Sequence, residues 1–197
     1  MTFSIQRGES VSMIGRNGAG KSTLLSIIAG VYQPNKGRCV VRGRVAPLLE
    51  LGAGFHPEMT GLENLTLNGM FLGLTKAKIL EKRDSIIAFS ELDEYIDQPI
   101  RKYSSGMIAR LGFSLVAHVD AEILIVDEVL SVGDFKFREK CQGFLNEFKL
   151  AGGTLLFVSH DAGASERNSE RSIWLKDGTI RMDGLTEDVG AAYLLEE

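Results

Sequence analysis

The stretch Gly15-Arg-Asn-Gly-Ala-Gly-Lys-Ser-Thr23 decides the fold, because it fits the pattern GxxxxGK[ST]. Residues 9–14, which precede it, are typical of a short buried strand, and the pattern from residue 21 to about 29 is helical, with Gly30 as a stop. A glycine-rich turn between a strand and a helix is the setting in which this pattern binds phosphate groups. The sequence therefore predicts a nucleotide-binding loop; the alternative is a glycine-rich turn that only caps a structural helix.

Each residue type in this loop has a chemical reason for its place. Glycines leave room for a phosphate against the main chain and let amide N–H groups turn inward, and the first amides of the helix add partial positive charge. Lys21 can reach the β- and γ-phosphates, Ser22 offers a hydroxyl oxygen to Mg²⁺, and Thr23 is placed to donate to the α-phosphate. The predicted nucleotide-binding residues are Gly15, Arg16, Asn17, Gly18, Ala19, Gly20, Lys21, Ser22 and Thr23.

Two later apolar runs predict buried parallel strands that end at polar residues. Residues 123–126 lead directly into Asp127 and Glu128, and residues 154–158 lead into Ser159 and His160. Strands that alternate with helices predict an open, largely parallel α/β sheet, with sites at the carboxyl ends of the strands.

These strand ends supply the remaining candidates for catalysis. Asp127 is expected to bind the Mg²⁺ that Ser22 contacts, and Glu128 to orient and deprotonate an attacking water. His160 is expected within reach of the γ-phosphate. The alternatives are a solvated charge at Glu128 and a packed or surface imidazole at His160.

The rest of the chain predicts supporting structure. Residues 57–118 indicate a helical insertion that opens with a capping box at Thr60-Gly-Leu-Glu63. Short β runs are expected over 37–51, and a hairpin that turns at Asp177-Gly178 is expected before a short terminal helix. Cys141 falls on the apolar stripe of a further helix, which predicts a core residue rather than a reactive thiol.

Composition limits the classes of partner. The 197 residues include 22 Lys+Arg and 26 Asp+Glu, for a net charge of -4, and 44% are apolar, which is typical of a well-packed domain. The acidic balance and the lack of a basic run argue against nucleic acid. No apolar run approaches the ~18 to 20 residues that span a bilayer, and two scattered cysteines favour a reducing, cytosolic compartment.

Tyr103-Ser-Ser-Gly-Met107, at the head of a helix, completes a pattern that resembles the signature of ABC-type ATPases. Together with GRNGAGKST at 15–23, ILIVDE at 123–128, SVGD at 131–134 and SHD at 159–161, its order and spacing are similar to those of an ABC nucleotide-binding domain over nearly the whole chain. LLELGAGFHPEMTGLEN at 48–64 and DEVLSVGD at 127–134 are similar to the ATPases that export O-antigen, teichoic acid and related polysaccharides.

The resemblance implies a P-loop, RecA-like fold with an inserted helical subdomain at about 57–118. It also implies an ATPase that uses ATP and Mg²⁺, with Lys21, Glu128 and His160 as catalytic residues. It implies a head-to-tail homodimer around two ATP molecules, in which Ser104, Ser105 and Gly106 of one copy close over the nucleotide of the other. It also implies an integral membrane permease as partner, which would place the chain at the cytoplasmic face of the cytoplasmic membrane. From the residues alone, an ordinary pair of N-cap serines is the favoured interpretation of this helix start.

Three features depart from the family pattern. Ser105 and Met107 stand where the superfamily usually has Gly and Gln, and Glu50 stands where it usually has a Gln that contacts Mg²⁺; a carboxylate at Glu50 is still able to bind the metal. Met1 lies fourteen residues before Gly15, so the family's first strand and its adenine-stacking aromatic have no counterpart here. A misassigned start, a truncated chain or a loosely held adenine would each account for this, and lost stacking would weaken ATP binding about ten- to a hundred-fold.

The leading hypothesis is an ATPase subunit that powers polysaccharide export through a permease. The alternative is a truncated or inactive fragment that acts only as a nucleotide-gated binding module. An ABC ATPase of DNA repair or translation is disfavoured by the acidic balance and by the lack of a second cassette.

Overall fold

The computed structural model describes residues 1–48, 52, 54–127, 134–158 and 162–196. The chain divides into two compact units. The first, which we call the sheet unit, comprises Met1–Pro47, Ala121–Glu128 and Glu147–Glu197, and the second, which we call the helical unit, comprises Leu48–Asp120 and Val129–Asn146.

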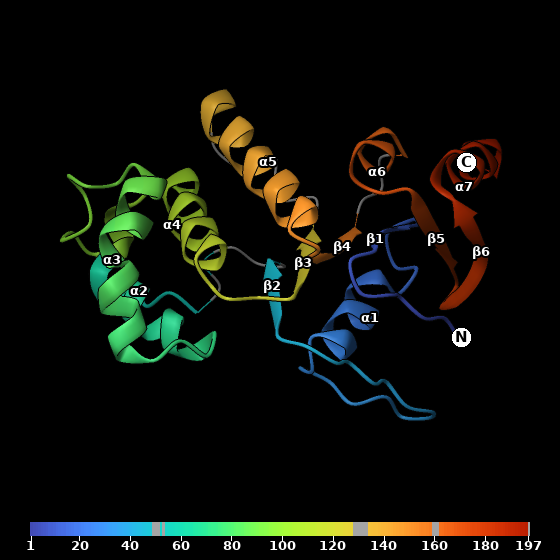
Figure 1. Cartoon of the computed structure of the whole chain (residues 1–197), viewed down its shortest axis with the longest axis horizontal. Helices are drawn as coiled ribbons and strands as arrows, with labels where there is room; N and C mark the ends of the chain where they lie inside the picture. Colours follow the sequence, from blue (N-terminus) through green and yellow to red (C-terminus); the bar gives the residue numbers. More distant parts are fainter. Residues whose placement is uncertain (49–51, 53, 128–133, 159–161, 197) are drawn as a thin grey trace. The chain divides into compact units, whose positions relative to one another are not determined.

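The sheet unit is built on six strands in the order β2-β3-β4-β1-β5-β6 (Figure 1). Their bounds are β1 Ser10–Ile14, β2 Val45–Leu48, β3 Ile123–Asp127, β4 Thr154–Val158, β5 Arg171–Lys176 and β6 Thr179–Leu185. The pairs β1–β4, β1–β5 and β3–β4 are parallel, whereas β5 and β6 form an antiparallel hairpin. The predicted open, largely parallel sheet is therefore confirmed.

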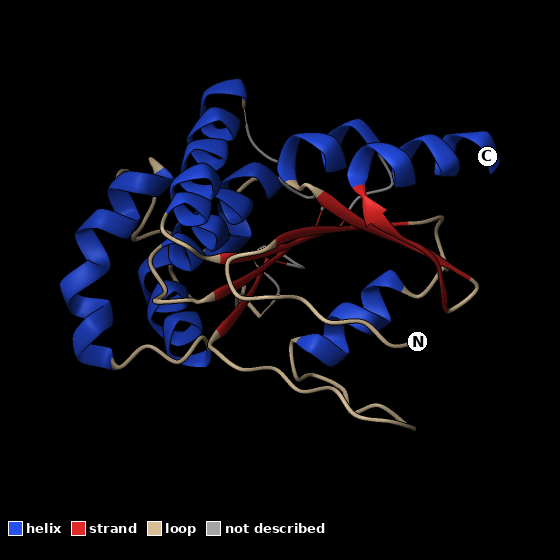
Figure 2. Cartoon of the chain, turned by 45° about the vertical axis from the view of Figure 1, so that its right-hand side comes forward, coloured by secondary structure: helices blue, strands red, loops and turns tan. Residues whose placement is uncertain are grey.

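Helices cover both faces of this sheet. Figure 2 shows α6 Ala162–Asn168 and α7 Thr186–Glu196 on one face, and α1 Lys21–Ile28 on the other. One side of the core consists of Ile14, Trp174, Val189 and Tyr193. The Trp174 and Tyr193 rings pack edge to face, with their centroids 5.5 Å apart. Burial on both faces explains why β1 and β4 have almost uninterrupted buried residues.

The predicted hairpin and terminal helix are confirmed, but the short strands expected before β2 are not. Asp177 and Gly178 at the hairpin turn both have positive φ, 49° and 72°, the geometry of a type I′ turn. From Gly37 to Arg44 the chain forms no strand, so this part of the expected β region is wrong. Gly37 and Gly43 have φ of 80° and 127°, which interrupts an extended backbone, and Val40 is 66% exposed rather than packed.

The helical unit contains α2 Gly61–Phe71, α3 Lys76–Ser90, the 3₁₀ turn η1 Ile100–Lys102, α4 Ser105–Ala117 and the first part of α5 Phe135–Leu150. The predicted capping box is confirmed, because the Thr60 hydroxyl accepts from the Glu63 N–H and the Glu63 carboxylate accepts from the Thr60 N–H. The α2, α3 and α4 helices enclose an apolar core that includes Leu65, Ile86 and Leu111.

Candidate functional site

The predicted nucleotide-binding loop lies between β1 and α1, and its shape depends on glycine. Gly15, Gly18 and Gly20 have φ of 150°, 84° and 100°. A Cβ atom at Gly15 would lie 2.3 Å from the carbonyl oxygen of Leu175 in β5, so no larger residue fits without a shift of the backbone. At Gly18 nothing lies within 4 Å of that position, and there the backbone conformation alone favours glycine.

The Lys21 side chain folds back on this loop. Its ammonium group donates to the carbonyl oxygen of Gly15, and at 3.1 Å to that of Arg16. The positive charge is therefore held against the main chain of the loop, in the region where this pattern places phosphate groups. A bound phosphate would compete with these two carbonyls for the ammonium group.

The β5–β6 hairpin supports the loop from outside. The Gly178 N–H, at the hairpin turn, donates to the carbonyl oxygen of Ala19 at 3.2 Å. The Ala19 side chain is buried, and a Cβ atom at Gly20 would lie 3.8 Å from the Gly178 Cα atom. Sequence reasoning predicted this turn but did not connect it with the loop, because no local pattern links positions so far apart in the chain.

The sheet register brings the ends of three strands to one edge. Val158 at the end of β4 pairs with Met13 of β1 on one side and with Asp127 of β3 on the other. Adjacent strands are about 4.8 Å apart, so the loop that begins at Gly15 starts about two strand spacings from the position of Asp127. The prediction that sites gather at this edge thus has a geometric basis in the register.

The donor set at this edge suits magnesium. Ser22 lies exposed in the first turn of α1 and offers a hydroxyl oxygen, and Asp127 is the last residue of β3 at the same edge. Mg²⁺ prefers oxygen ligands and completes its shell with phosphate and water rather than with a full cage of protein ligands. The described residues hold no group of three or more His, Cys, Asp or Glu that could hold a metal ion.

Several predicted residues lie outside the described part of the chain. These are Glu50, Glu128 and His160, and also the side chain of Asp127. Their assigned roles stay predictions.

The Ser104–Gly106 segment belongs to the helical unit, at the start of α4. Ser104 is the N-cap, and its hydroxyl oxygen accepts from the Met107 N–H at 3.2 Å. Ser104 and Ser105 are exposed, and Gly106 is half-buried.

Tyr103 anchors this helix start. Its ring is buried, and its hydroxyl donates to the carbonyl oxygen of Tyr95 at 2.7 Å. Burial, followed by the nearby charge of Asp97, raises the pKa of Tyr103 to about 12. A Cβ atom at Gly61 would lie 2.3 Å from this hydroxyl, so α2 has a glycine where the tyrosine packs.

Comparison with known proteins identifies a matching family and several related proteins. A family model described as "ABC transporter" matches residues 1–131. The O-antigen export system ATP-binding protein RfbB of Klebsiella pneumoniae is 50% identical over 193 residues, which are 98% of this chain and 78% of that protein. The teichoic acids export ATP-binding protein TagH of Listeria monocytogenes is 42% identical over 98% of this chain and 57% of that protein.

One solved structure with a similar fold is a dimeric post-hydrolysis state of an ATP-binding cassette bound to ADP and Pi. Its TM-score to this chain is 0.77 and its sequence identity is 23%, over 93% of this chain and 88% of that one. This likeness confirms the predicted fold class, a mostly parallel sheet around a phosphate loop with inserted helices. Within the described residues, no helix is both long and apolar enough to cross a bilayer.

Proposed function

The chain belongs to the ABC transporter family, and on this premise we propose that it is the ATP-hydrolysing subunit of a transporter that exports a polysaccharide across the cytoplasmic membrane. The observation that carries the proposal is the loop of Gly15–Lys21, which opens at the sheet edge where β3 and β4 also end. The names of the relatives, which concern O-antigen and teichoic acid export, support a surface polysaccharide as the cargo.

The phosphate loop supplies the binding chemistry. Its inward amides and the Lys21 ammonium group would neutralise the β- and γ-phosphates, with Arg16, Asn17 and Ala19 contributing main-chain groups and Thr23 donating to the α-phosphate. Ser22 and Asp127, with Glu50 as a further candidate, would hold Mg²⁺, which neutralises phosphate charge when bound.

The hydrolytic step falls to residues at the ends of β3 and β4. Glu128 would accept a proton from water as its oxygen attacks the γ-phosphorus, and the bond to the leaving oxygen of ADP would break. His160 would hold the γ-phosphate in place. Positioning and electrostatic stabilisation would supply most of the rate enhancement.

A second copy of the chain would complete each site. Ser104, Ser105 and Gly106 stand at the start of a thirteen-residue helix where the two serines are exposed, and we assign them to the nucleotide held by Lys21 of the other copy. A head-to-tail homodimer would then enclose two ATP molecules. An integral membrane permease would hold this dimer at the cytoplasmic face of the membrane, while the net charge of -4 argues against nucleic acid as a partner.

The test is ATP hydrolysis by the purified chain with Mg²⁺. Lys21→Ala should abolish ATP binding, and Glu128→Gln should preserve binding but abolish turnover. Glu147→Gln, an exposed carboxylate in α5, is the matched control and should retain full activity. Activity that survives both Lys21→Ala and Glu128→Gln overturns the assignment, and binding without any turnover in the wild type favours a nucleotide-gated binding module.

A further inference from the structure

The end of the β5–β6 hairpin, residues 175–181, which we call the hairpin tip, contacts the phosphate loop at two places. The carbonyl oxygen of Leu175 leaves room only for glycine at position 15, where the loop begins. The Gly178 N–H donates to the carbonyl oxygen of Ala19, near the end of the loop. A shift of the hairpin tip would therefore change the shape of the loop at both places.

Glu196, near the end of α7, holds both arms of the hairpin tip. Its Oε2 accepts from the ammonium group of Lys176 at 2.8 Å, and its Oε1 accepts from the guanidinium group of Arg181 at 2.9 Å. Lys176 ends β5 and Arg181 lies in β6, so the two cations stand on opposite sides of the turn. The hydrogen bonds from Lys176 and then from Arg181 lower the pKa of Glu196, and the carboxylate is charged at neutral pH.

The packing of α7 places Glu196 at the hairpin tip. Val189 and Tyr193 are buried, and the Tyr193 ring packs edge to face against Trp174 of β5. Residues 189, 193 and 196 are spaced by four and three, which puts them on one face of the helix. Glu196 therefore continues the stripe by which α7 packs on the hairpin (Figure 1). The helix and the hairpin tip are joined by apolar packing and by a carboxylate that binds two cations.

A second ion pair on the same hairpin provides a matched comparison. Asp183 of β6 accepts from Arg171 at 2.7 and 2.8 Å through its two oxygens. Its side chain is 30% exposed, against 33% for Glu196. Asp183 pairs in register with Ile173, away from the turn. Because ion pairs this exposed usually contribute little to stability, an effect specific to Glu196 would come from its place at the hairpin tip.

We infer that Glu196 is a positioning residue for ATP binding, which ties the end of α7 to the hairpin tip that shapes the phosphate loop. The inference rests on the proposed function, because it assumes that this loop binds ATP. It requires no contact between Glu196 and the nucleotide. Anything that displaces this carboxylate from Lys176 and Arg181 would then weaken ATP binding.

The first experiment measures ATP affinity, turnover and melting temperature in matched variants. Glu196→Gln keeps the size of the side chain and removes its charge, and we expect the Kd for ATP to rise about threefold. The kcat at saturating ATP should stay unchanged, because no group near the γ-phosphate is altered. Loss of a negative charge would by itself favour an anionic ligand, so long-range charge does not explain a weaker affinity.

Asp183→Asn is the control, because it removes the same charge from the same hairpin. It should lower the melting temperature at least as much as Glu196→Gln and leave the Kd for ATP unchanged. Combining Lys176→Met with Glu196→Gln should weaken ATP binding no further than Glu196→Gln alone, since both remove one interaction. An unchanged Kd in Glu196→Gln, an equal rise in Asp183→Asn, or multiplied effects in the double variant each overturns the inference.

A second readout needs no nucleotide. In the nucleotide-free chain, amide hydrogen exchange at Gly178 and over residues 15–21 should be faster in Glu196→Gln than in the wild type and unchanged in Asp183→Asn. Unchanged exchange in Glu196→Gln overturns the inference even if the Kd rises. Should the wild type fail to bind ATP, the proposed function fails, and the exchange measurement still decides whether Glu196 holds the loop.

Discussion

The hairpin turn next to the phosphate loop offers a sharp test of whether support from outside the loop matters for nucleotide binding. The Gly178 N–H donates to the carbonyl oxygen of Ala19 in the loop, whereas the N–H of Gly152, which follows α5, does not donate to the loop. The two glycines are otherwise alike: their φ values are 72° and 82°, and nothing lies within 4 Å of the position that a Cβ atom would take at either. Gly178→Ala and Gly152→Ala therefore impose the same backbone strain in the same open space.

The expected magnitudes separate the two effects. A left-handed alanine costs about 1 to 2 kcal/mol, which lowers the melting temperature of a chain of this size by about 2 to 8 °C in either variant. In Gly178→Ala the strained turn also loosens the hydrogen bond to Ala19, which is worth about 0.5 to 1.5 kcal/mol. If that energy helps to shape the loop for ATP, the Kd for ATP rises about two- to tenfold in Gly178→Ala alone.

The assay is ATP binding by titration calorimetry below the melting temperature of both variants, with the melting curves recorded in parallel. Equal ATP affinity in Gly178→Ala and Gly152→Ala would refute the reasoning, because the loop would then keep its shape without the hairpin. A loss of affinity in Gly152→Ala as large as in Gly178→Ala would refute it too, since general destabilisation would be the cause.

Three further predictions concern the helical unit and the cysteines. Thr60→Ala removes the hydroxyl oxygen that accepts from the Glu63 N–H, keeps the hydrogen bond from the Thr60 N–H to the Glu63 carboxylate, and should destabilise the fold by about 1 kcal/mol in a urea titration, with KM for ATP unchanged. Burial raises the pKa of Cys141 to about 12, so iodoacetamide at pH 8 should alkylate the exposed Cys39 and spare Cys141 until the chain unfolds, as mass spectrometry would show. Hydrogen bonds from Lys78 and Lys82 of α3 lower the pKa of Asp120. The stabilising contribution of this carboxylate is therefore present above its unfolded-state pKa of about 4 and is lost as the pH falls below that value. Asp120→Asn should flatten the pH dependence of the unfolding midpoint between about pH 4 and pH 2.

The parts of the site that sequence could predict are those fixed by local patterns and by the geometry of parallel sheets. The glycine and lysine spacing of the loop is a short-range constraint, so the strand before it and the helix after it followed directly. Asp127 could be placed at the same edge because parallel strands leave a sheet with their carboxyl ends together. The capping box was equally local.

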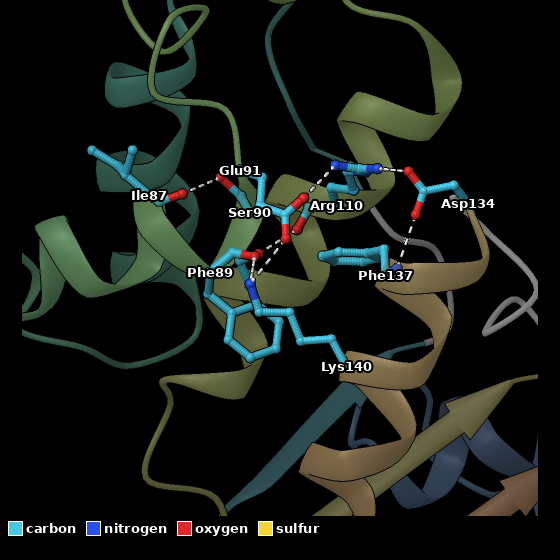
Figure 3. A network of polar contacts seen from close by, with 9 residues as sticks. Ile87, Phe89, Ser90, Glu91, Arg110, Asp134, Phe137 and Lys140 are labelled. Atoms are coloured by element: carbon cyan, nitrogen blue, oxygen red, sulfur yellow. Dashed lines mark hydrogen bonds and ion pairs between the residues drawn. The ribbon is translucent and has the colours of Figure 1, made fainter.

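The parts that sequence missed depend on contacts between distant positions. The ion pair between Arg110 and Asp134 within the helical unit (Figure 3) joins positions 24 residues apart, and each residue has an ordinary local explanation, a charge on a helix and an N-cap residue. The contact of Gly178 with Ala19 gives no signal in composition or periodicity. The short strands expected over 37–44 failed for the opposite reason: β propensity was present in Val40 and its neighbours, but a strand also needs a partner, and the described residues supply none there.

The contacts around the phosphate loop also bear on how ATP binding is driven. Gly15 is packed closely against Leu175, and Ala19 accepts a hydrogen bond from Gly178, so contacts within the protein support the shape of the loop. A ligand that binds a preformed loop loses little affinity to ordering the chain. If Lys21 binds phosphate as proposed, its ammonium group would trade the carbonyl oxygens of Gly15 and Arg16 for phosphate oxygens. Because phosphate is charged and the carbonyls are not, this exchange would favour the nucleotide.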